Sequence, residues 1–265
     1  MNAIVKYPGS KYKIAKEIIN LFPPHHSYLE PFFGSGAVLF NKERSNIETI
    51  NDLDGNVVNL FEIIRTDPEK LARIIYMTPY SREVYDKAYQ KAPADKFEAA
   101  LYFCIRLNMG YGCRTTGKVG WKNDVQGREK SYASYDWYNL SEKIMWAAER
   151  LRGVQIENMP ALKLIPRFNY KNVLIYCDPP YMLQTRHGKQ YLYEMNDKDH
   201  EMLLDVLLKH RGYVIISGYD TELYNSMLTG WTRYELTSYS QTGSKKQEIL
   251  WMNFRPYGQQ ITLCF

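Results

Sequence analysis

Residues 174–182 of the chain, "LIYCDPPYM", place an acidic residue directly after a short apolar run. An apolar run of this kind is typical of a strand that is buried on both faces of a parallel sheet. Asp178 ends the run, and Pro179 and Pro180 fix the backbone that follows. A loop aspartate that caps a helix and a plain proline-rich turn are the simpler interpretations. Because ligands of parallel sheets bind at the carboxyl ends of strands, we interpret Asp178 as a functional carboxylate.

Strand and helix patterns alternate on both sides of this stretch. Before it, short strands are expected at 28–30 and immediately before Asp52, with helices starting after a glycine turn at 34–36 and from about Asn56. After it, the helical pattern "DHEMLLDVLLKH" is followed by the apolar strand "GYVIISGYD". The last two strands, "WTRYEL" and "EILWMNF", have little helix between them and are expected to pair antiparallel. The pattern predicts an α/β fold with a sheet of about seven mostly parallel strands.

The alternation stops between about residues 65 and 152. Helical patterns such as "KFEAALYFCIRLNM" take its place, and a glycine-rich, basic and aromatic stretch, "GYGCRTTGKVGWKNDVQGREK", follows them. We therefore expect one domain made of residues 1–64 and 153–265, with residues 65–152 inserted as a helical and β-hairpin subdomain.

The composition indicates a globular protein with a substantial core. The chain has 265 residues, of which 45% are hydrophobic and 24% charged, and its net charge of +5 only slightly favours a nucleic-acid partner. Its cysteines and histidines show no ligand spacing, so neither a metal site nor a disulfide framework is expected. The first residues lack the apolar segment of a signal peptide, and no apolar run is long enough to span a membrane. We expect a cytoplasmic protein, and a monomer, because no heptad pattern is present.

Glycines and charged residues near the first two strands point to a ligand site. Gly34 and Gly36 follow the first strand, where glycine lets the backbone approach a ligand, although a plain strand-to-helix turn has the same pattern. Asp52 ends the second strand, where an acidic residue holds ribose hydroxyls in nucleoside-binding α/β folds. Capping of the next helix by Asp52 or Asp54 is the alternative. Lys11, in "YPGSK", could neutralise a ligand carboxylate or simply be a solvated lysine.

Four motifs in this order, "YPGSK", "EPFFGSG", the strand-end Asp52 and "DPPY", resemble those of the Dam-like adenine-N6-specific DNA methyltransferases. The likeness extends into "SGYDTELYNSML" and "KQEILWMNF", so it covers both ends of the chain and leaves out the middle insertion. The resemblance implies a Rossmann-like methyltransferase sheet, S-adenosylmethionine as the methyl donor and S-adenosylhomocysteine as the product. It also implies a bacterial or phage-borne enzyme, with restriction-modification as a typical setting.

The resemblance assigns roles to individual residues. Tyr7 and Lys11 would help to hold the cofactor, and Asp52 would take its ribose hydroxyls. The cofactor loop would consist of Pro31, Phe32, Gly34 and Gly36. The pocket for the target base would consist of Asp178, Pro179, Pro180 and Tyr181, and Asp178 would also border the cofactor. The family usually has two glycines before the lysine, where this chain has Gly9 and Ser10, a small change that we expect to be tolerated.

These residue types suit the methylation of an exocyclic amine. The lone pair of the adenine amine is delocalised into the ring, so the amine is a weak nucleophile. Asp178 and the carbonyl oxygen of Pro179 would each accept one N–H and return electron density to the nitrogen. Tyr181 would stack on the base once the base is flipped out of the duplex. Neither a metal nor a covalent enzyme intermediate is required.

The basic and aromatic stretch of the insertion is expected to bind double-stranded DNA. Lysine and arginine contact phosphates or guanine edges, and an aromatic side chain can fill the gap that a flipped base leaves. The expected DNA-binding residues are Tyr111, Arg114, Thr115, Thr116, Lys118, Trp121 and Lys122, with Arg128 and Lys130 nearby. An exposed loop with ordinary surface charge is the simpler interpretation. The stretch shares "CR" and a glycine-rich turn with hairpins that read GATC but departs at "TTGKVGWKND", so a GATC target does not follow.

The expected function is the transfer of a methyl group to N6 of a flipped adenine at a specific site in DNA. N4-cytosine methylation is the nearest alternative, since similar sites serve it, but the leading aspartate and the motif order favour adenine. Methylation of protein or RNA amines is more distant, because it has less need of a basic, aromatic insertion. A non-catalytic DNA-binding protein on a decayed methyltransferase fold is a further alternative, and the intact Gly34, Gly36, Asp52 and Asp178 argue against it.

Overall fold

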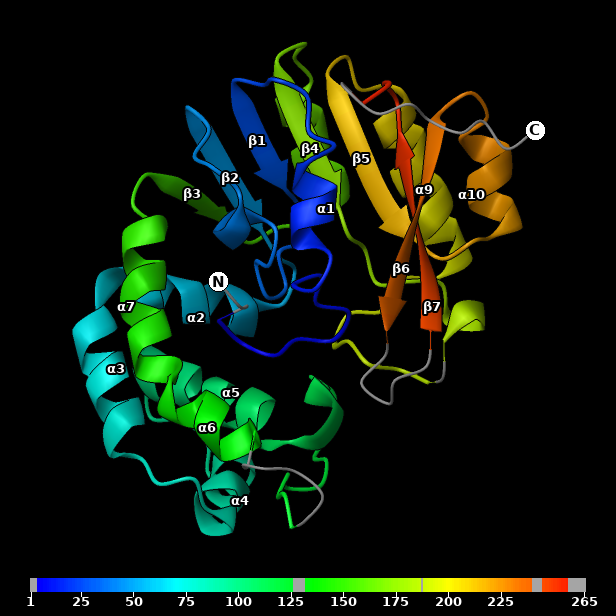
Figure 1. Cartoon of the computed structure of the whole chain (residues 1–265). Helices are drawn as coiled ribbons and strands as arrows, with labels where there is room; N and C mark the ends of the chain where they lie inside the picture. Colours follow the sequence, from blue (N-terminus) through cyan, green and yellow to red (C-terminus); the bar gives the residue numbers. More distant parts are fainter. Residues whose placement is uncertain (1–3, 126–131, 187, 240–244, 257–265) are drawn as a thin grey trace.

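The computed structural model describes residues 4–125, 132–186, 188–239 and 245–256, with a seven-stranded sheet at its centre (Figure 1). The strands are β1 (Ser27–Glu30), β2 (Ile47–Asn51), β3 (Val154–Glu157), β4 (Val173–Cys177), β5 (Tyr213–Gly218), β6 (Thr232–Tyr239) and β7 (Lys245–Met252). They lie in the order β3-β2-β1-β4-β5-β7-β6. The first five strands in this order are parallel, whereas β7 runs antiparallel to both β5 and β6. The expected α/β fold and the antiparallel final pair are confirmed.

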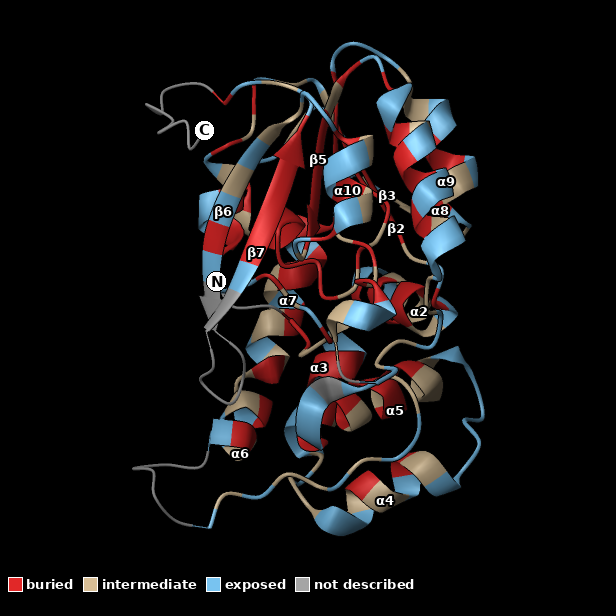
Figure 2. Ribbon diagram, turned by 90° about the vertical axis from the view of Figure 1, so that its right-hand side faces the viewer, coloured by how far each residue is buried: buried red, intermediate tan, exposed pale blue. Residues whose placement is uncertain are grey.

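Successive residues of the strands alternate between two hydrophobic clusters, one on each face of the sheet. Tyr28 and Tyr176 belong to one cluster, and their neighbours Leu29, Ile175 and Cys177 belong to the other. The second face packs against α8 (Ala161–Leu164), α9 (Asp197–Leu208) and α10 (Glu222–Met227), which are drawn to the right of β5 and β7 in Figure 2. The first face packs against α1 (Ala15–Ile19) and α2 (Gly55–Thr66). Burial on both faces explains why β4 is apolar throughout.

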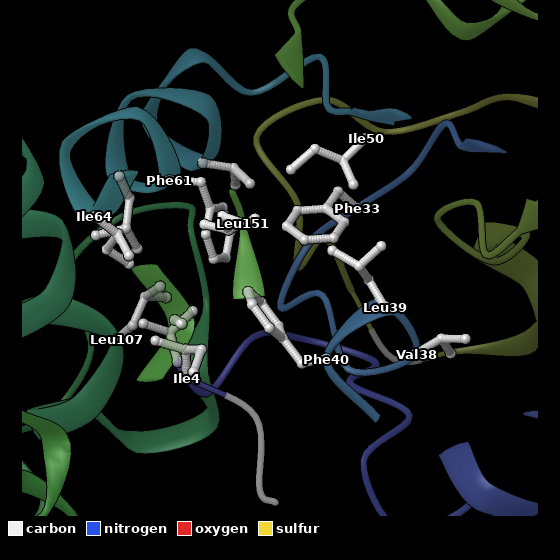
Figure 3. Packing of buried hydrophobic residues seen from close by; sticks show 14 of the residues in the cluster. Ile4, Phe33, Val38, Leu39, Phe40, Ile50, Phe61, Ile64, Leu107 and Leu151 are labelled. Carbon is white, nitrogen blue, oxygen red and sulfur yellow. The ribbon is translucent and has the colours of Figure 1, made fainter. Parts of the chain in front are cut away.

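A group of helices separates α2 from β3 in the sequence and lies below the sheet in Figure 1. These helices are α3 (Pro68–Met77), α4 (Arg82–Gln90), α5 (Lys96–Met109), α6 (Tyr132–Tyr138) and α7 (Leu140–Arg150). Their apolar side chains join the first cluster, so that Leu107 and Leu151 belong to the same core as Phe61 (Figure 3). Arg150, at the end of α7, donates hydrogen bonds of 2.6 and 2.9 Å to Glu48 of β2. The inserted helices therefore share one continuous core with the sheet, and the proposed domain limits stay a prediction.

The loops after β1, β2, β4 and β5 meet at one edge of the sheet, which is the edge that carries the site. The backbone N–H of Phe33 donates to the carbonyl oxygen of Asn51 at 2.9 Å and joins the loops after β1 and β2. The helix expected after the glycine turn is only a 3-10 turn, η1 (Leu39–Asn41), in which Leu39 and Phe40 are both buried. The other 3-10 turns are η2 (Tyr111–Cys113), η3 (Ile165–Phe168) and η4 (Leu183–Thr185). Within the described ranges, no helix has the length and apolarity that crossing a bilayer requires.

Candidate active site

A cavity of about 260 Å³ opens at this edge of the sheet. The N-terminal segment, the loops after β1, β2 and β3, and the segment after β4 all contribute to its wall. Most of the residues expected to bind a cofactor or a base line it: Tyr7, Lys11, Pro31, Phe32, Gly34, Asp52, Asp178 and Pro180. Gly36, Pro179 and Tyr181 lie outside the lining. The fold thus brings together motifs that are more than 100 residues apart in the sequence.

The glycine loop after β1 has a backbone that favours glycine. Gly34 and Gly36 have φ angles of +48° and +66°. A Cβ atom at Gly34 would lie 2.9 Å from the ring of Tyr7, and one at Gly36 would lie 2.4 Å from the ring of Phe33. The glycines therefore allow both the turn and the close packing of Tyr7 against the loop.

Asp52 joins the loops after β1 and β2. Its Oδ2 accepts a hydrogen bond from the backbone N–H of Gly34 at 2.8 Å, and its Oδ1 accepts one from Asp54 at 2.9 Å. Burial raises the pKa of Asp52 to about 6, although these two backbone hydrogen bonds lower it. The cap of α2 is Asp54, whose side chain accepts from the backbone N–H of Asn56. The capping alternative is therefore correct for Asp54 and leaves Asp52 at the cavity.

Asp178 lies at the end of β4, where two neighbours hold one of its oxygens. Its Oδ1 is 2.8 Å from Nζ of Lys11 and accepts a hydrogen bond of 2.8 Å from Oγ of Ser217. Ser217 belongs to β5, and the parallel register, which pairs Cys177 with Ile216, brings it beside Asp178. Burial raises the pKa of Asp178 above its usual value, and the neighbouring Lys11 opposes this effect.

Lys11 is buried, with a side-chain exposure of 5%, so its interpretation as a solvated lysine is wrong. Its ammonium lies 2.7 Å from the carbonyl oxygen of Gly9, 2.8 Å from Asp178 Oδ1 and 3.4 Å from Glu248 Oε1. Burial alone would lower the pKa of Lys11, but the two carboxylates outweigh burial and hold the pKa above its ordinary value. The site therefore contains an ammonium shared by two carboxylates.

Tyr181 is packed beside the cavity rather than in its wall. Its hydroxyl donates to Glu248, and its ring meets Tyr219 edge-on with centroids 4.7 Å apart. Nζ of Lys11 lies 4.8 Å from the centroid of the same ring. The stacking of Tyr181 on a target base stays a prediction.

Glu30 lines the cavity, although only its place in the "EPFFGSG" pattern drew attention to it in the sequence. Its carboxylate accepts a hydrogen bond of 2.9 Å from the hydroxyl of Tyr28. Burial raises the pKa of Glu30 to about 8, against the lowering effect of the Tyr28 hydrogen bond. Glu30 is therefore a protonated or easily protonated acid at neutral pH.

Other residues of the site were missed in the sequence. Pro160 follows β3 and lines the cavity, and the rule that ligands lie at the carboxyl ends of strands would have found it. Tyr191 also lines the cavity, with its ring centroid 6.0 Å from that of Tyr7. No local pattern marks Tyr191, whereas Ser217 and Glu248 fall within "SGYDTELYNSML" and "KQEILWMNF", which shared the family likeness without pointing to a role for either residue.

The expected DNA-binding stretch forms a loop that is closed at its base. Gly110 and Trp121 form an isolated antiparallel bridge after the end of α5. In the described residues the expected β-hairpin is reduced to this bridge, because a stretch so rich in glycine has little strand propensity. Arg128 and Lys130, which were also expected near the DNA, lie outside the described residues.

Some of the expected DNA-binding side chains contact other residues of the protein. The ring of Trp121 lies 5.6 Å from that of Tyr80, and the guanidinium of Arg82 lies 4.8 Å from the Trp121 ring. Lys118 forms a 2.6 Å ion pair with Asp86. The Trp121 contacts help to hold the loop, whereas the pair of Lys118 and Asp86 lies at the surface and contributes little to stability.

Thr115 connects the loop to the segment after β4. Its backbone N–H donates to the carbonyl oxygen of Gln190 at 3.2 Å, and its Oγ1 accepts from the backbone N–H of Leu192 at 3.0 Å. Its hydroxyl also lies near that of Tyr7, where it lowers the pKa of Tyr7 against the dominant raising effect of burial. The exposed residues of the set are Tyr111, Arg114 and Lys118, whereas Thr116 and Lys122 are half-buried.

Comparison with models of known families matches residues 7–241 to the family described as D12 class N6 adenine-specific DNA methyltransferase. The chain is 25% identical over 288 aligned positions to the Type II methyltransferase M.FokI of Planomicrobium okeanokoites. This alignment covers 96% of this chain and 43% of that protein. The chain thus spans less than half the length of that relative. It is 26% identical over 238 positions to a DNA adenine methylase of Serratia marcescens, covering 83% of this chain and 84% of the relative. A DNA adenine methylase of Vibrio cholerae is 24% identical over 234 positions, with coverages of 83% and 82%.

Proposed function

Because the chain belongs to the family of D12 class N6 adenine-specific DNA methyltransferases, we propose that its cavity binds S-adenosylmethionine beside Asp178. The proposed reaction transfers the methyl group to N6 of an adenine that is flipped out of double-stranded DNA at a specific site. The observation that carries this proposal is the position of Asp178, which lines the cavity at the end of β4 while Lys11 and Ser217 hold its Oδ1.

The residues of the cavity fit S-adenosylmethionine. The Asp52 carboxylate ends β2, where it can accept the ribose hydroxyls, and Phe32, Leu53 and Pro160 supply apolar wall for the adenine ring of the cofactor. When bound, the cofactor supplies a methyl group activated by its sulfonium centre. Lys11 directs its ammonium to Asp178 and Glu248, so we place Lys11 beside the reacting amine rather than on the cofactor.

In the proposed mechanism, Asp178 and the carbonyl oxygen of Pro179 accept the two N–H groups of the adenine amine. This would raise the electron density on N6, so that its lone pair could take up the methyl group that the bound cofactor would supply, with the cofactor sulfur as the leaving group. The methylated amine then loses one proton to Asp178. Tyr181 would stack on the base and keep its amine beside Asp178.

The DNA partner is proposed to lie against the loop that follows α5. Tyr111 and Arg114 are exposed there. Tyr111 can contact the bases, and Arg114 can contact the phosphates. Lys118 and Trp121 contact Asp86 and Tyr80 of the protein. We therefore propose that these two residues hold the conformation of the loop and do not contact the DNA. We propose that a single copy of the chain carries out the reaction.

The proposal is tested by methyl transfer from tritiated S-adenosylmethionine to mixed-sequence duplex DNA. We expect label in the DNA with the wild-type protein and a loss of at least about a thousandfold with Asp178→Asn, which keeps the shape and removes the charge. Asp205→Asn, at an exposed position of α9, is the matched control and should retain activity. Binding of the cofactor without any incorporation of label would show a non-catalytic protein and overturn the proposal.

A further inference from the structure

Ser217 is fully buried at the carboxyl end of β5, on the strand next to β4. Its Oγ lies 2.8 Å from Asp178 Oδ1 and 3.2 Å from the carbonyl oxygen of Cys177, so its single proton goes to the closer and charged acceptor. The hydroxyl of Tyr176 lies 3.5 Å from the same Oγ. Ser217 is therefore a buried donor directed at the proposed catalytic carboxylate.

The two close contacts of the Asp178 carboxylate fall on the same oxygen. Lys11 and Ser217 each lie 2.8 Å from Oδ1, and they come from different parts of the fold, the N-terminal segment and β5. The carboxylate of an aspartate rotates about its Cβ–Cγ bond, and contacts from two directions fix its orientation about that bond. With Oδ1 held in this way by described residues, Oδ2 is the oxygen that can accept an N–H of the substrate amine.

We propose that Ser217 is a positioning residue for methyl transfer, which holds Oδ1 of Asp178 together with Lys11 and thereby presents Oδ2 to the amine. This inference rests on the proposed function, in which Asp178 accepts from the amine. Ser217 is not among the residues that line the cavity, so it acts through Asp178 and not on the substrate or the cofactor.

The groups around Asp178 explain why a neutral donor matters at this position. The charged and titratable groups that face Asp178 come from six parts of the fold and are Lys11, Glu30, Tyr176, Cys177, Tyr181, Tyr191, Tyr224 and Glu248. Lys11 is the single cation among these groups, and it is shared with Glu248. Burial raises the pKa of Asp178, Lys11 lowers it, Glu248 raises it, and the hydrogen bond from Ser217 lowers it. Loss of the serine hydroxyl therefore raises the pKa further and leaves more of Asp178 protonated at a given pH.

The kinetic test compares Ser217→Ala, which removes the donor, with Ser217→Thr, which keeps a hydroxyl on the strand. Ser226→Ala on α10, whose hydroxyl donates to the carbonyl oxygen of Leu223 at 3.0 Å, is the matched control. We expect Ser217→Ala to lower kcat about tenfold, to leave KM for S-adenosylmethionine unchanged, and to move the acid limb of the pH profile to higher pH. Ser217→Thr should restore the position of the acid limb, and Ser226→Ala should behave as wild type.

A second measurement does not depend on activity. The carboxyl carbon of Asp178, followed by NMR as the pH is varied, reports its pKa directly, and we expect this pKa to be higher in Ser217→Ala than in wild type. An unchanged pKa, or a lower kcat with the acid limb in its wild-type position, would overturn the proposal. If the wild-type protein does not methylate DNA, the proposed function fails. A raised pKa of Asp178 in Ser217→Ala would in that case still support the hydrogen bond by which Ser217 positions the Asp178 carboxylate.

Discussion

Lys11 determines the charge balance of the site. Its three partners come from separate parts of the chain: Gly9 lies two residues before it, Asp178 follows β4, and Glu248 belongs to β7. A buried ion pair contributes little net stability when it is complete, but removal of one partner leaves an uncompensated buried charge. Here two carboxylates would be left, one of which is proposed to act on the amine.

We expect Lys11→Gln to destabilise the fold by about 3–5 kcal/mol, because Asp178 and Glu248 would then lie close together without a cation. The same loss should raise the pKa of Asp178 and move the acid limb of methyl transfer to higher pH. Urea unfolding and a pH–rate profile measure the two effects. Lys13→Gln, at an exposed position two residues away, is the control, and equal effects of the two variants would contradict this account.

Glu30 is expected to make stability depend on pH. Its pKa is about 8 in the folded protein and near 4.5 when unfolded, so the folded state holds a proton that the unfolded state releases. Stability should therefore fall as the pH rises from about 4.5 to about 8 and should not fall further on account of this group above that range. Glu30→Gln can still accept the hydrogen bond from Tyr28 but does not titrate. Between these two pH values its melting temperature should therefore fall less than that of wild type, by on the order of a few degrees. Glu17→Gln, on the exposed side of α1, should leave the wild-type pH dependence in place, and the same slope in Glu30→Gln would contradict the assignment.

Among the elements, the loop after α5 and the segment after β4 form one connected surface beside the cavity. Thr115 accepts from the backbone N–H of Leu192, donates its own backbone N–H to Gln190 and contacts Tyr7. A residue with these partners is better placed to hold the segment 188–196 than to read a base. The proposed DNA loop is therefore connected by hydrogen bonds to the segment 188–196, which follows the proposed catalytic residues.

Thr115→Val should loosen this connection, because the substitution keeps the shape of the side chain and removes its hydroxyl. We expect faster amide hydrogen exchange in residues 188–196 and a several-fold loss of kcat/KM, with the sequence preference for DNA unchanged. Thr116→Val, at the neighbouring half-buried position, is the matched control for exchange. A changed target sequence with unaltered exchange in Thr115→Val would show instead that Thr115 contacts the bases.

The elements could be predicted where neighbouring residues carry the signal. The apolar run of β4, the prolines after Asp178 and the positive φ angles at Gly34 and Gly36 all follow from contiguous sequence. The contacts of Lys11 and of Thr115 could not be predicted, because their partners are far away in the chain and become neighbours only when the strands are paired. Among the described residues, the regular hairpin expected after α5 is reduced to the bridge between Gly110 and Trp121, since glycine gives the backbone freedom without specifying a ladder.

In the whole molecule, one hydrophobic cluster extends from the first face of the sheet into the inserted helices. Leu107 of α5 and Leu151 after α7 belong to the same core as Phe61 of α2 (Figure 3). The buried ion pair between Arg150 and Glu48 joins α7 to β2 as well. A core of this kind predicts that the insertion and the sheet unfold together.

Leu107→Ala is expected to destabilise the entire chain by about 2–5 kcal/mol in a single transition, since it opens a cavity in the shared core. Circular dichroism and cofactor binding, followed in the same urea titration, should report the same midpoint. Leu208→Ala, at a position with 43% exposure, is the control with the same change of side chain. Two separated transitions would contradict the shared core and would favour independent domains with limits near residues 65 and 152.

The central claim is that the Asp178 site methylates the N6 amine of adenine. The most direct measurement is nucleoside mass spectrometry of DNA from cells that express the wild-type chain, and from matched cells that express Asp178→Asn. The account predicts N6-methyladenine in the first DNA and only the background level of untransformed cells in the second. N4-methylcytosine in the first DNA, or N6-methyladenine at equal levels in both, would contradict it.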